Sequence, residues 1–245
     1  MFDWTNTYLE LESSDVDTAV LLIGALEQHG RHLPISVDRF VGEALAKGVA
    51  EGLNACELPG IPVGNSHAHH GFRGSVSVSP ETLDGIVRDI SLTLLRQGFR
   101  RIAVLNFHGG NLIVKPTTRD INLTQDMGKV VQLHPSFVAA KRLSTIFKAD
   151  LADEQHAGEL ETSLMLHLAP EQVGPQRIDR VPNLGPAEFD YRPMRDFCPD
   201  GVWGRSGLAS AEKGKQALAA MIEDTVVVFE ETFTRLGVPT RHRPS

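Results

Sequence analysis

Acidic and histidine side chains gather in the segment GALEQHGRHLPISVD, residues 24–38, directly after an apolar run. Glu27 and His29 stand two positions apart, and the two-residue period of an extended chain would point both side chains to the same side. Asp38 follows nine residues after His29, at the end of a loop whose reach is limited by a proline. A compact Glu/His/Asp cluster is feasible here, and the alternative is a loop whose side chains simply meet solvent.

A second histidine leaves another apolar run in the segment NFHGGN, residues 106–111. His108 is followed by Gly109 and Gly110, which let the backbone approach a neighbour closely. No GxGxxG or GxxxxGK[ST] pattern occurs, so nucleotide binding is not favoured. Ligands of open α/β sheets bind at the carboxyl ends of strands, where His108 would join the first cluster.

The segment HAGELETSLMLHL, residues 156–168, reads as a helix. Its buried face is marked by Leu160, Leu164 and Leu168. Glu161 lies beside that face and needs a partner if it is buried, whereas Glu159 is expected to face solvent near the first turn. His156 stands at or just before the helix N-terminus, where the helix dipole favours the neutral imidazole. We therefore predict functional roles for His156 and Glu161 and a structural one for Glu159.

Three further histidines fall within four residues, at His67, His69 and His70. With no acid or cysteine near them in sequence, and with adjacent side chains pointing apart, at most one or two can face a site. One of them is expected to contact substrate or to support a ligand. His134 and His167 are predicted to be structural.

Glu27, His29, Asp38 and His108 form a ligand set of nitrogen and oxygen donors, which suits two divalent metal ions such as Zn, Mn or Fe with a shared aspartate between them. A metal lowers the pKa of bound water, so a hydroxide nucleophile forms at neutral pH. His156 could then protonate a leaving nitrogen. The set predicts hydrolysis of a C–N bond.

Length and composition are consistent with such an enzyme. The chain has 245 residues, 41% of them apolar, a net charge of −7 and no Lys/Arg cluster, which argues against nucleic acid as a partner. Its start lacks signal-peptide features and its longest apolar run is too short to span a membrane, so we expect a cytoplasmic protein that does not bind membranes. Cys56 and Cys198 lie far apart and suggest neither a disulfide framework nor a thiolate zinc site.

Strands alternate with helices along the chain, which predicts an α/β fold with a mostly parallel sheet and helices on both faces. The expected strands cover residues 18–25, 58–63, 74–79, 99–107 and 129–134. The expected helices cover residues 40–53, 80–97, 112–127, 157–168 and 209–236, with a Pro/Gly-rich segment over residues 170–207. Neither a repeat nor a linker is visible, so residues 1–245 are predicted to form one domain.

These motifs, in this order, resemble the creatininase (creatinine amidohydrolase) family. The matching segments are GALEQHGRHLPISVD, HHGFRGSVSVSPETL, LNFHGGN, HAGELETSLML and DGVWGRSGLASAEKG. The resemblance implies a three-layer α/β/α fold, a homohexamer and a dinuclear metal site that hydrolyses amide-like C–N bonds. It also implies metal ligation by Glu27, His29, Asp38 as the bridge and His108, with His156 as proton carrier and Glu161 as a site carboxylate.

Departures from the family pattern narrow the range of substrates that we expect. Gly110 stands where creatinine hydrolysis uses a ligating Glu, and Ala152 where a ring-stacking Trp is expected, so creatinine is not favoured. Members with the glycine act as formamide deformylases in flavin or deazaflavin precursor synthesis, as peptide-trimming enzymes in mycofactocin maturation, or on cyclic polyol ketones. Arg31 and Arg73, where Pro is usual, could meet an anionic substrate, or could simply be solvated surface residues.

With glycine at position 110, the second metal would have only His29 and Asp38 as protein ligands, which is too few for a stable site. Glu161 is expected to complete the second metal site, and the alternative is that Glu161 only orients a neighbour.

The predicted function is a metal-dependent amidohydrolase acting on a small amide, cyclic amide or formamide. The alternatives are a family member in cofactor biosynthesis, either formamidopyrimidine deformylase-like or mycofactocin peptide-trimming, and a non-catalytic binding protein stabilised by metal.

Overall fold

A four-stranded parallel sheet forms the centre of the computed structural model, which describes residues 1–150 and 153–238. The strands are β1 (Thr18–Ile23), β2 (Cys56–Glu57), β3 (Arg101–Asn106) and β4 (Lys129–Leu133), in the order β2-β1-β3-β4. Every residue of β1 and β3 is buried, as expected of central strands covered on both faces. The prediction of an α/β fold with a parallel sheet is confirmed.

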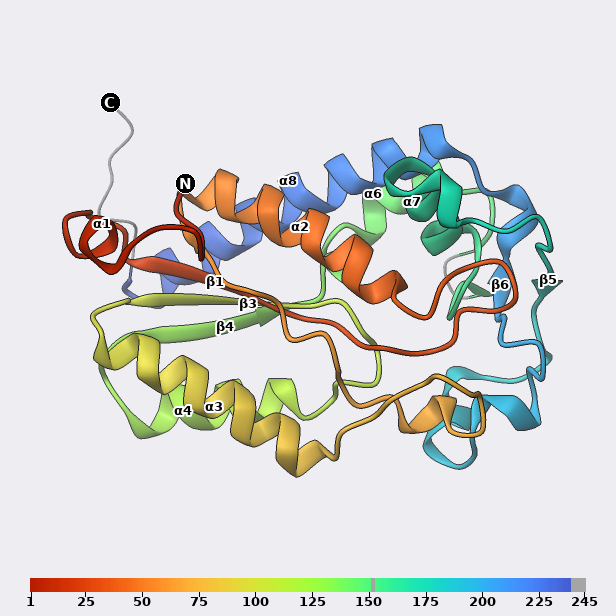
Figure 1. The fold of residues 1–245 in the computed structure, drawn as a ribbon, viewed down its shortest axis with the longest axis horizontal. Helices are drawn as coiled ribbons and strands as arrows, with labels where there is room; N and C mark the ends of the chain where they lie inside the picture. The colour runs from red at the N-terminus through yellow and green to blue at the C-terminus, as the bar shows by residue number, and fades with distance from the viewer. Residues whose placement is uncertain (151–152, 239–245) are drawn as a thin grey trace.

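Helices cover both faces of this sheet (Figure 1). On one face α2 (Val37–Leu53), α7 (Glu159–Leu168) and α8 (Ala211–Arg235) pack on Val20 and Leu22 of β1. On the other face α3 (Pro80–Arg96) and α4 (Val114–Thr124) pack on Ala19 and Ile23. Alternate residues of one strand therefore serve two separate cores, and the predicted three-layer α/β/α arrangement is confirmed.

Capping residues predicted both ends of α3 correctly. The Ser79 hydroxyl accepts a hydrogen bond from the Thr82 amide at 3.2 Å, Pro80 takes the first helical position, and Gly98 follows α3 with φ of +98°. By contrast, α2 begins at Val37 instead of residue 40. Asp38 consequently lies in the first turn of a helix and not at the end of a loop.

The two strands expected over residues 58–63 and 74–79 are wrong. In the first segment only Ile61 bridges to β1, and in the second only Val76 bridges to Leu26. Pro59 and Pro62 lack the amide hydrogens that a continued strand ladder needs. The second strand of the sheet lies slightly earlier, as β2.

Short elements that sequence periodicity did not predict connect the framework. The α-helices among them are α1 (Tyr8–Glu12), α5 (Pro135–Val138) and α6 (Ala140–Ile146). The 3-10 helices are η1 (His67–His69), η3 (Pro170–Gln172), η4 (Pro186–Asp190), η5 (Met194–Asp196) and η6 (Ser206–Leu208), and β5 (Asp179–Arg180) pairs antiparallel with β6 (Gly204–Arg205). The Pro/Gly-rich segment therefore forms ordered short elements beside the strand ends.

None of the described helices combines the length and apolarity that a membrane crossing requires.

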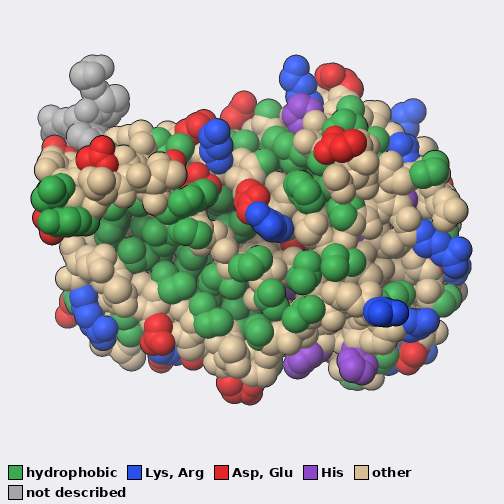
Figure 2. All heavy atoms as spheres, in the orientation of Figure 1, with side chains coloured by type: hydrophobic (Ala, Val, Ile, Leu, Met, Phe, Trp, Pro, Cys, Tyr) green, Lys and Arg blue, Asp and Glu red, His purple; other side chains and the backbone are tan. Residues whose placement is uncertain are grey.

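Hydrophobic side chains gather on one face of the molecule, centrally and toward α1 (Figure 2). A hollow of about 310 Å³ is lined there by Trp4, Leu58, Pro59 and Pro62 among others, and the Trp4 side chain is 57% exposed. The hollow beside β2 is partly open and mixes these apolar side chains with the charged Arg39, Glu43 and Glu57.

An ion pair between a buried arginine and a partly exposed glutamate ties the start of β3 to α8. Arg101 is fully buried, and its guanidinium donates to both carboxylate oxygens of Glu230 at 2.8 and 3.0 Å and to the Thr18 hydroxyl at 2.8 Å. Glu230→Gln should lower the free energy of unfolding by about 1–3 kcal/mol, because the buried guanidinium loses its countercharge. Urea denaturation measures this loss.

The matched control for that variant is Glu223→Gln on the same helix. Glu223 pairs with Arg142 at the surface, where its side chain is 63% exposed, so its loss should change the free energy of unfolding by less than about 1 kcal/mol. Equal effects of the two substitutions would contradict a special role for the Arg101 pair.

Candidate metal centre and substrate pocket

The predicted ligands meet at the carboxyl ends of β1 and β3. These neighbouring strands are in register from Thr18 with Arg101 to Ile23 with Asn106, so the segments that follow them start at the same edge. Glu27 and His29 come from the segment after β1, and His108 comes from the segment after β3. Asp38 and Glu161 approach from the first turns of α2 and α7. The structure brings all five predicted metal ligands together.

Two groups of potential ligands share one aspartate. In the first, His108 Nδ1 lies 3.3 Å from Glu27 Oε1 and 3.5 Å from Asp38 Oδ2. In the second, His29 Nε2 lies 3.7 Å from Asp38 Oδ1 and 3.6 Å from Glu161 Oε1. Within each group the ligand atoms lie within 4.8 Å of one another. This is the spacing that two metal ions bridged by Asp38 would need.

Backbone carbonyls orient the two ligand histidines. His29 Nδ1 pairs with the Glu27 carbonyl at 3.1 Å, and His108 Nε2 pairs with the Asn65 carbonyl at 2.9 Å. Since a carbonyl only accepts, each of these nitrogens carries the proton, and the other ring nitrogen can present its lone pair to the centre. Such fixed orientation is typical of metal-ligating histidines.

Several ligand atoms are buried without a hydrogen-bond partner. Among the described residues these include Glu27 Oε2, His29 Nε2 and Asp38 Oδ2, and the three residues are at most 2% exposed. A buried polar atom left unpaired is costly. Because all three atoms belong to residues of the two groups above, the residues fit bound divalent cations.

The electrostatics of the centre also favour positive charge. Burial raises the pKa of Asp38 to about 8, and the Glu27 and Glu161 carboxylates add to that rise. Burial alone would lower the pKa of His29, but Glu161 and Asp38 outweigh it and raise that pKa to about 10. Without metal, crowded carboxylates are thus balanced by protons on histidine, which a divalent cation would displace on binding.

His156 lies against the centre but hydrogen-bonds elsewhere. Its Nε2 donates to the Gln28 carbonyl at 2.6 Å, which leaves Nδ1 unprotonated and 3.7 Å from Glu27 Oε1. Burial lowers its pKa to about 4, and the charge of nearby His29 adds to that effect. A lowered pKa agrees with the neutral state predicted from the helix dipole, but its main cause is burial. The Glu161 carboxylate is anchored by the Ala157 amide at 2.6 Å.

His69 is the one of the three clustered histidines that contacts the centre most closely. Its Nε2 lies 3.2 Å from Glu27 Oε1, and its Nδ1 accepts from the Gln28 side-chain amide at 3.1 Å. It therefore donates to Glu27 and supports that ligand. The expectation that one of the three histidines supports a ligand is met by His69, although its acid, Glu27, is near it in space and not along the chain. His70 is exposed.

Asn111 is a positioning residue that the sequence argument missed. Its side-chain amide donates to the Gly24 carbonyl at 3.2 Å and to the Asn106 side chain at 3.1 Å, while its oxygen accepts from the Asn65 amide at 2.8 Å. It thus joins the ends of β1 and β3 to the loop whose carbonyl holds His108. The only sequence signal was its place at the end of HGGN.

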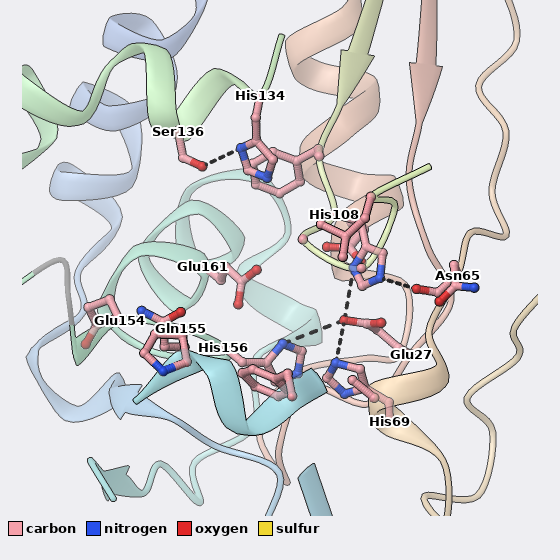
Figure 3. Close-up of a pocket in the computed structure, with 18 of the residues that line it drawn as sticks. Glu27, Asn65, His69, His108, His134, Ser136, Glu154, Gln155, His156 and Glu161 are labelled. Atoms are coloured by element: carbon pink, nitrogen blue, oxygen red, sulfur yellow. Dashed lines mark hydrogen bonds and ion pairs between the residues drawn. The ribbon is translucent and has the colours of Figure 1, made fainter. Parts of the chain in front are cut away.

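The centre lies in a pocket of about 510 Å³ (Figure 3). Glu27, Asp38, His108, His156 and Glu161 line it together with side chains from η1, η4 and the segment after β4. His134 and Ser136 project toward this space in Figure 3, and His134 Nδ1 bonds the Ser136 hydroxyl at 2.8 Å. The prediction that His134 is only structural therefore needs correction, since its ring forms part of the pocket wall.

The prediction that Glu159 faces solvent is wrong. The residue is fully buried. Its carboxylate pairs with Lys213 of α8 and accepts a hydrogen bond from the Ala149 amide at 2.9 Å. The side of α7 that was expected to face solvent is covered by α8, which the helical pattern of α7 alone cannot reveal.

The two arginines considered for an anionic substrate, Arg31 and Arg73, are exposed and do not line the pocket. Ala152 lies outside the described residues.

A three-layer α/β fold with a buried His/carboxylate centre at its strand ends is an arrangement that can hold divalent metal ions. The family model described as creatininase, creatinine amidohydrolase, matches residues 3–229. The chain belongs to the creatininase family and is a hydrolase of that family.

Individual relatives agree with that membership. Creatinine amidohydrolase of Pseudomonas putida is 32% identical, over 87% of this chain and 89% of its own length. Mycofactocin precursor peptide peptidase of Mycobacterium tuberculosis is 30% identical, over 84% and 82%. A solved structure of a mutant creatininase complexed with creatine superposes with a TM-score of 0.81 and 28% identity, covering 94% of this chain and 98% of the other.

The adjacent glycines of HGGN differ sharply in their surroundings. A Cβ at Gly110 would lie 2.5 Å from His108 Nε2 and would also overlap the Asn65 carbonyl, whereas one at Gly109 would meet nothing within 4 Å. Gly110→Ala should displace the His108 ring and weaken metal binding by roughly 10–100-fold, the usual scale for disturbed support of a ligand. Gly109→Ala is the matched control and should bind metal like the parent chain. Competition with a metallochromic chelator measures both, and equal affinities would contradict this reading of the loop.

Proposed function

We propose that the protein hydrolyses a C–N bond in a small amide, cyclic amide or formamide with the help of two divalent metal ions. The observation that carries this proposal is the pair of ligand groups that share Asp38 on the floor of the pocket. Family membership supports the same class of reaction. Peptide bonds are not the expected substrate.

The residues divide between the two ions as follows. Glu27 and His108 would hold one ion, His29 and Glu161 the other, and Asp38 would bridge them. Nitrogen and oxygen donors of this kind accept Zn, Mn or Fe, and solved creatininases include a Mn form and a Zn-Zn form. When bound, the ions would act as Lewis acids that lower the pKa of water and polarise a carbonyl.

His156 would be the proton carrier. Because Nε2 is committed to the Gln28 carbonyl, the proton would be taken up and passed on at Nδ1, the atom that faces Glu27. The ring lines the pocket, so a substrate bound there could reach it. A binding protein stabilised by metal would have no use for such a group, which favours an enzyme over that alternative.

The second candidate is a role in cofactor biosynthesis. The 30% identity to mycofactocin precursor peptide peptidase supports a peptide-trimming reaction, and the glycine at position 110 supports a formamidopyrimidine deformylase-like one. Both would use the same centre. They differ in the size of the substrate and in what surrounds the scissile bond.

We also propose a homohexamer, as the family resemblance implies. The apolar face near α1, with Trp4 57% exposed, is a surface where subunits of one kind could pack (Figure 2). Light scattering at several protein concentrations tests this assembly.

Metal analysis followed by a substrate screen tests the proposed function. Purified protein should contain divalent metal, and the screen compares small formamides, open amides, lactams and creatinine. Formamides or open amides should be turned over faster than creatinine, since Gly110 removes a carboxylate that creatinine hydrolysis uses. Metal-loaded protein that hydrolyses none of these compounds would contradict the proposal.

Glu161→Gln distinguishes a metal ligand from an orienting carboxylate. We expect this variant to bind about one metal ion per chain instead of about two, because the second ion loses one of its three protein ligands. Asp38→Asn should lose both ions, since it removes the shared ligand. Titration followed by elemental analysis gives the stoichiometry. Full occupancy of both sites in Glu161→Gln would show that Glu161 only orients a neighbour.

His156→Ala should keep its metal and lose turnover by roughly 10²–10⁴-fold, the scale expected for a positioned proton carrier. Turnover is measured with the best substrate of the screen and metal content by elemental analysis. His70→Ala, an exposed neighbour of the pocket, is the control and should behave like the parent. Loss of metal from His156→Ala would make His156 a ligand instead.

A further inference from the structure

The pocket contains acids beyond those of the metal centre. Besides the carboxylates of the metal centre, Glu154 and Asp190 line it, and none of its described lining residues is a lysine or arginine. Basic side chains of the surrounding segments are engaged elsewhere, as when Arg192 binds Glu188 at 2.8 Å and Lys213 binds Glu159. A negatively charged substrate would find no lysine or arginine among these described walls.

These two acids differ in how far their charge is already satisfied. Glu154 accepts hydrogen bonds from the Glu159 and Arg205 amides, the latter at 2.7 Å. Asp190 stands at the end of η4, is exposed, and has no ion pair or side-chain hydrogen bond within the described part of the chain. Its carboxylate is therefore free to receive a group that enters the pocket.

Aromatic rings accompany this carboxylate. Phe137 lines the pocket with its side chain 75% exposed, and it stacks on His134 with a centroid distance of 4.3 Å. Phe189, one residue before Asp190, also lines the pocket and is held by stacking on Trp203 at 5.4 Å. Rings of this kind together with a carboxylate are the usual surroundings of an ammonium or amidinium group.

We propose that the substrate carries a positively charged amine or amidinium on the part that extends away from the metal centre, and that Asp190, which lines the pocket next to Phe189, binds it. The inference rests on the proposed function, because the amide to be cleaved lies at the centre. The carboxylates of the centre do not serve this purpose, since bound cations would offset their charge. Asp190 alone among the five acids that line the pocket is left with neither a metal role nor a backbone donor.

Three matched hydroxamic acids test this assignment on the metal-loaded protein. A hydroxamate group binds active-site metals, and the probes 5-aminopentanohydroxamic acid, hexanohydroxamic acid and adipic monohydroxamic acid end in an ammonium, a methyl and a carboxylate respectively. Calorimetry measures their dissociation constants. We expect the ammonium probe to bind roughly three- to tenfold more tightly than the methyl probe, the carboxylate probe to bind most weakly, and the preference to shrink as salt is added.

Two variants test whether Asp190 causes the preference for the ammonium probe. Asp190→Asn should bind the ammonium and methyl probes equally while its affinity for the methyl probe stays that of the parent. Glu188→Gln is the matched control, because it removes a carboxylate from the same helix η4 that pairs with Arg192 and does not line the pocket. It should keep the full preference.

The possible failures are separable. If the parent protein binds all three probes equally, the inference is overturned and the proposed function stands. If the preference survives in Asp190→Asn, or disappears in Glu188→Gln, the assignment to Asp190 is wrong. If metal-loaded protein binds no hydroxamate at all, the proposed metal centre fails, and this inference fails with it.

Discussion

Three carboxylates buried within reach of one another are the constraint on which this structure depends. Glu27 and Asp38 are almost fully buried, and Glu161 points into the same space with 19% of its side chain exposed. Such a group is costly unless positive charge compensates it. The histidines and the proposed metal ions supply that charge, and the sheet supplies the rigid edge that keeps the acids from moving apart.

Backbone carbonyls and amide side chains fix the centre more than ion pairs do. His29, His108 and His156 each commit one ring nitrogen to a carbonyl, so each has only one nitrogen left for the centre. Asn111 connects the carbonyl that holds His108 to the ends of two strands. The roles of the ring nitrogens are therefore set by the fold itself, before any metal or substrate binds.

The same pocket has two chemically different parts. Its floor consists of ligands that come from strand ends and helix starts, elements shared by a three-layer fold of this kind. Its outer wall consists of His134 and Phe137 after β4 and of η4, short segments joined to the framework by loops. Because loops can change without disturbing the sheet, this division lets one centre serve different substrates, and it explains why family membership fixes the reaction type more firmly than the substrate.

The sequence by itself determined the alternation of strands and helices, the helix α3 with its caps, and the cluster of Glu27, His29, Asp38 and His108, because these depend on local periodicity and on residue types near strand ends. Tertiary structure alone decided the remainder. Glu159 is buried only because α8 packs over it, His69 reaches Glu27 only because η1 lies against the segment that follows β1, and Asp190 meets the pocket only through η4. Contacts between segments distant along the chain leave no period in the sequence, so only the folded chain shows which charges are satisfied and which are left for a ligand.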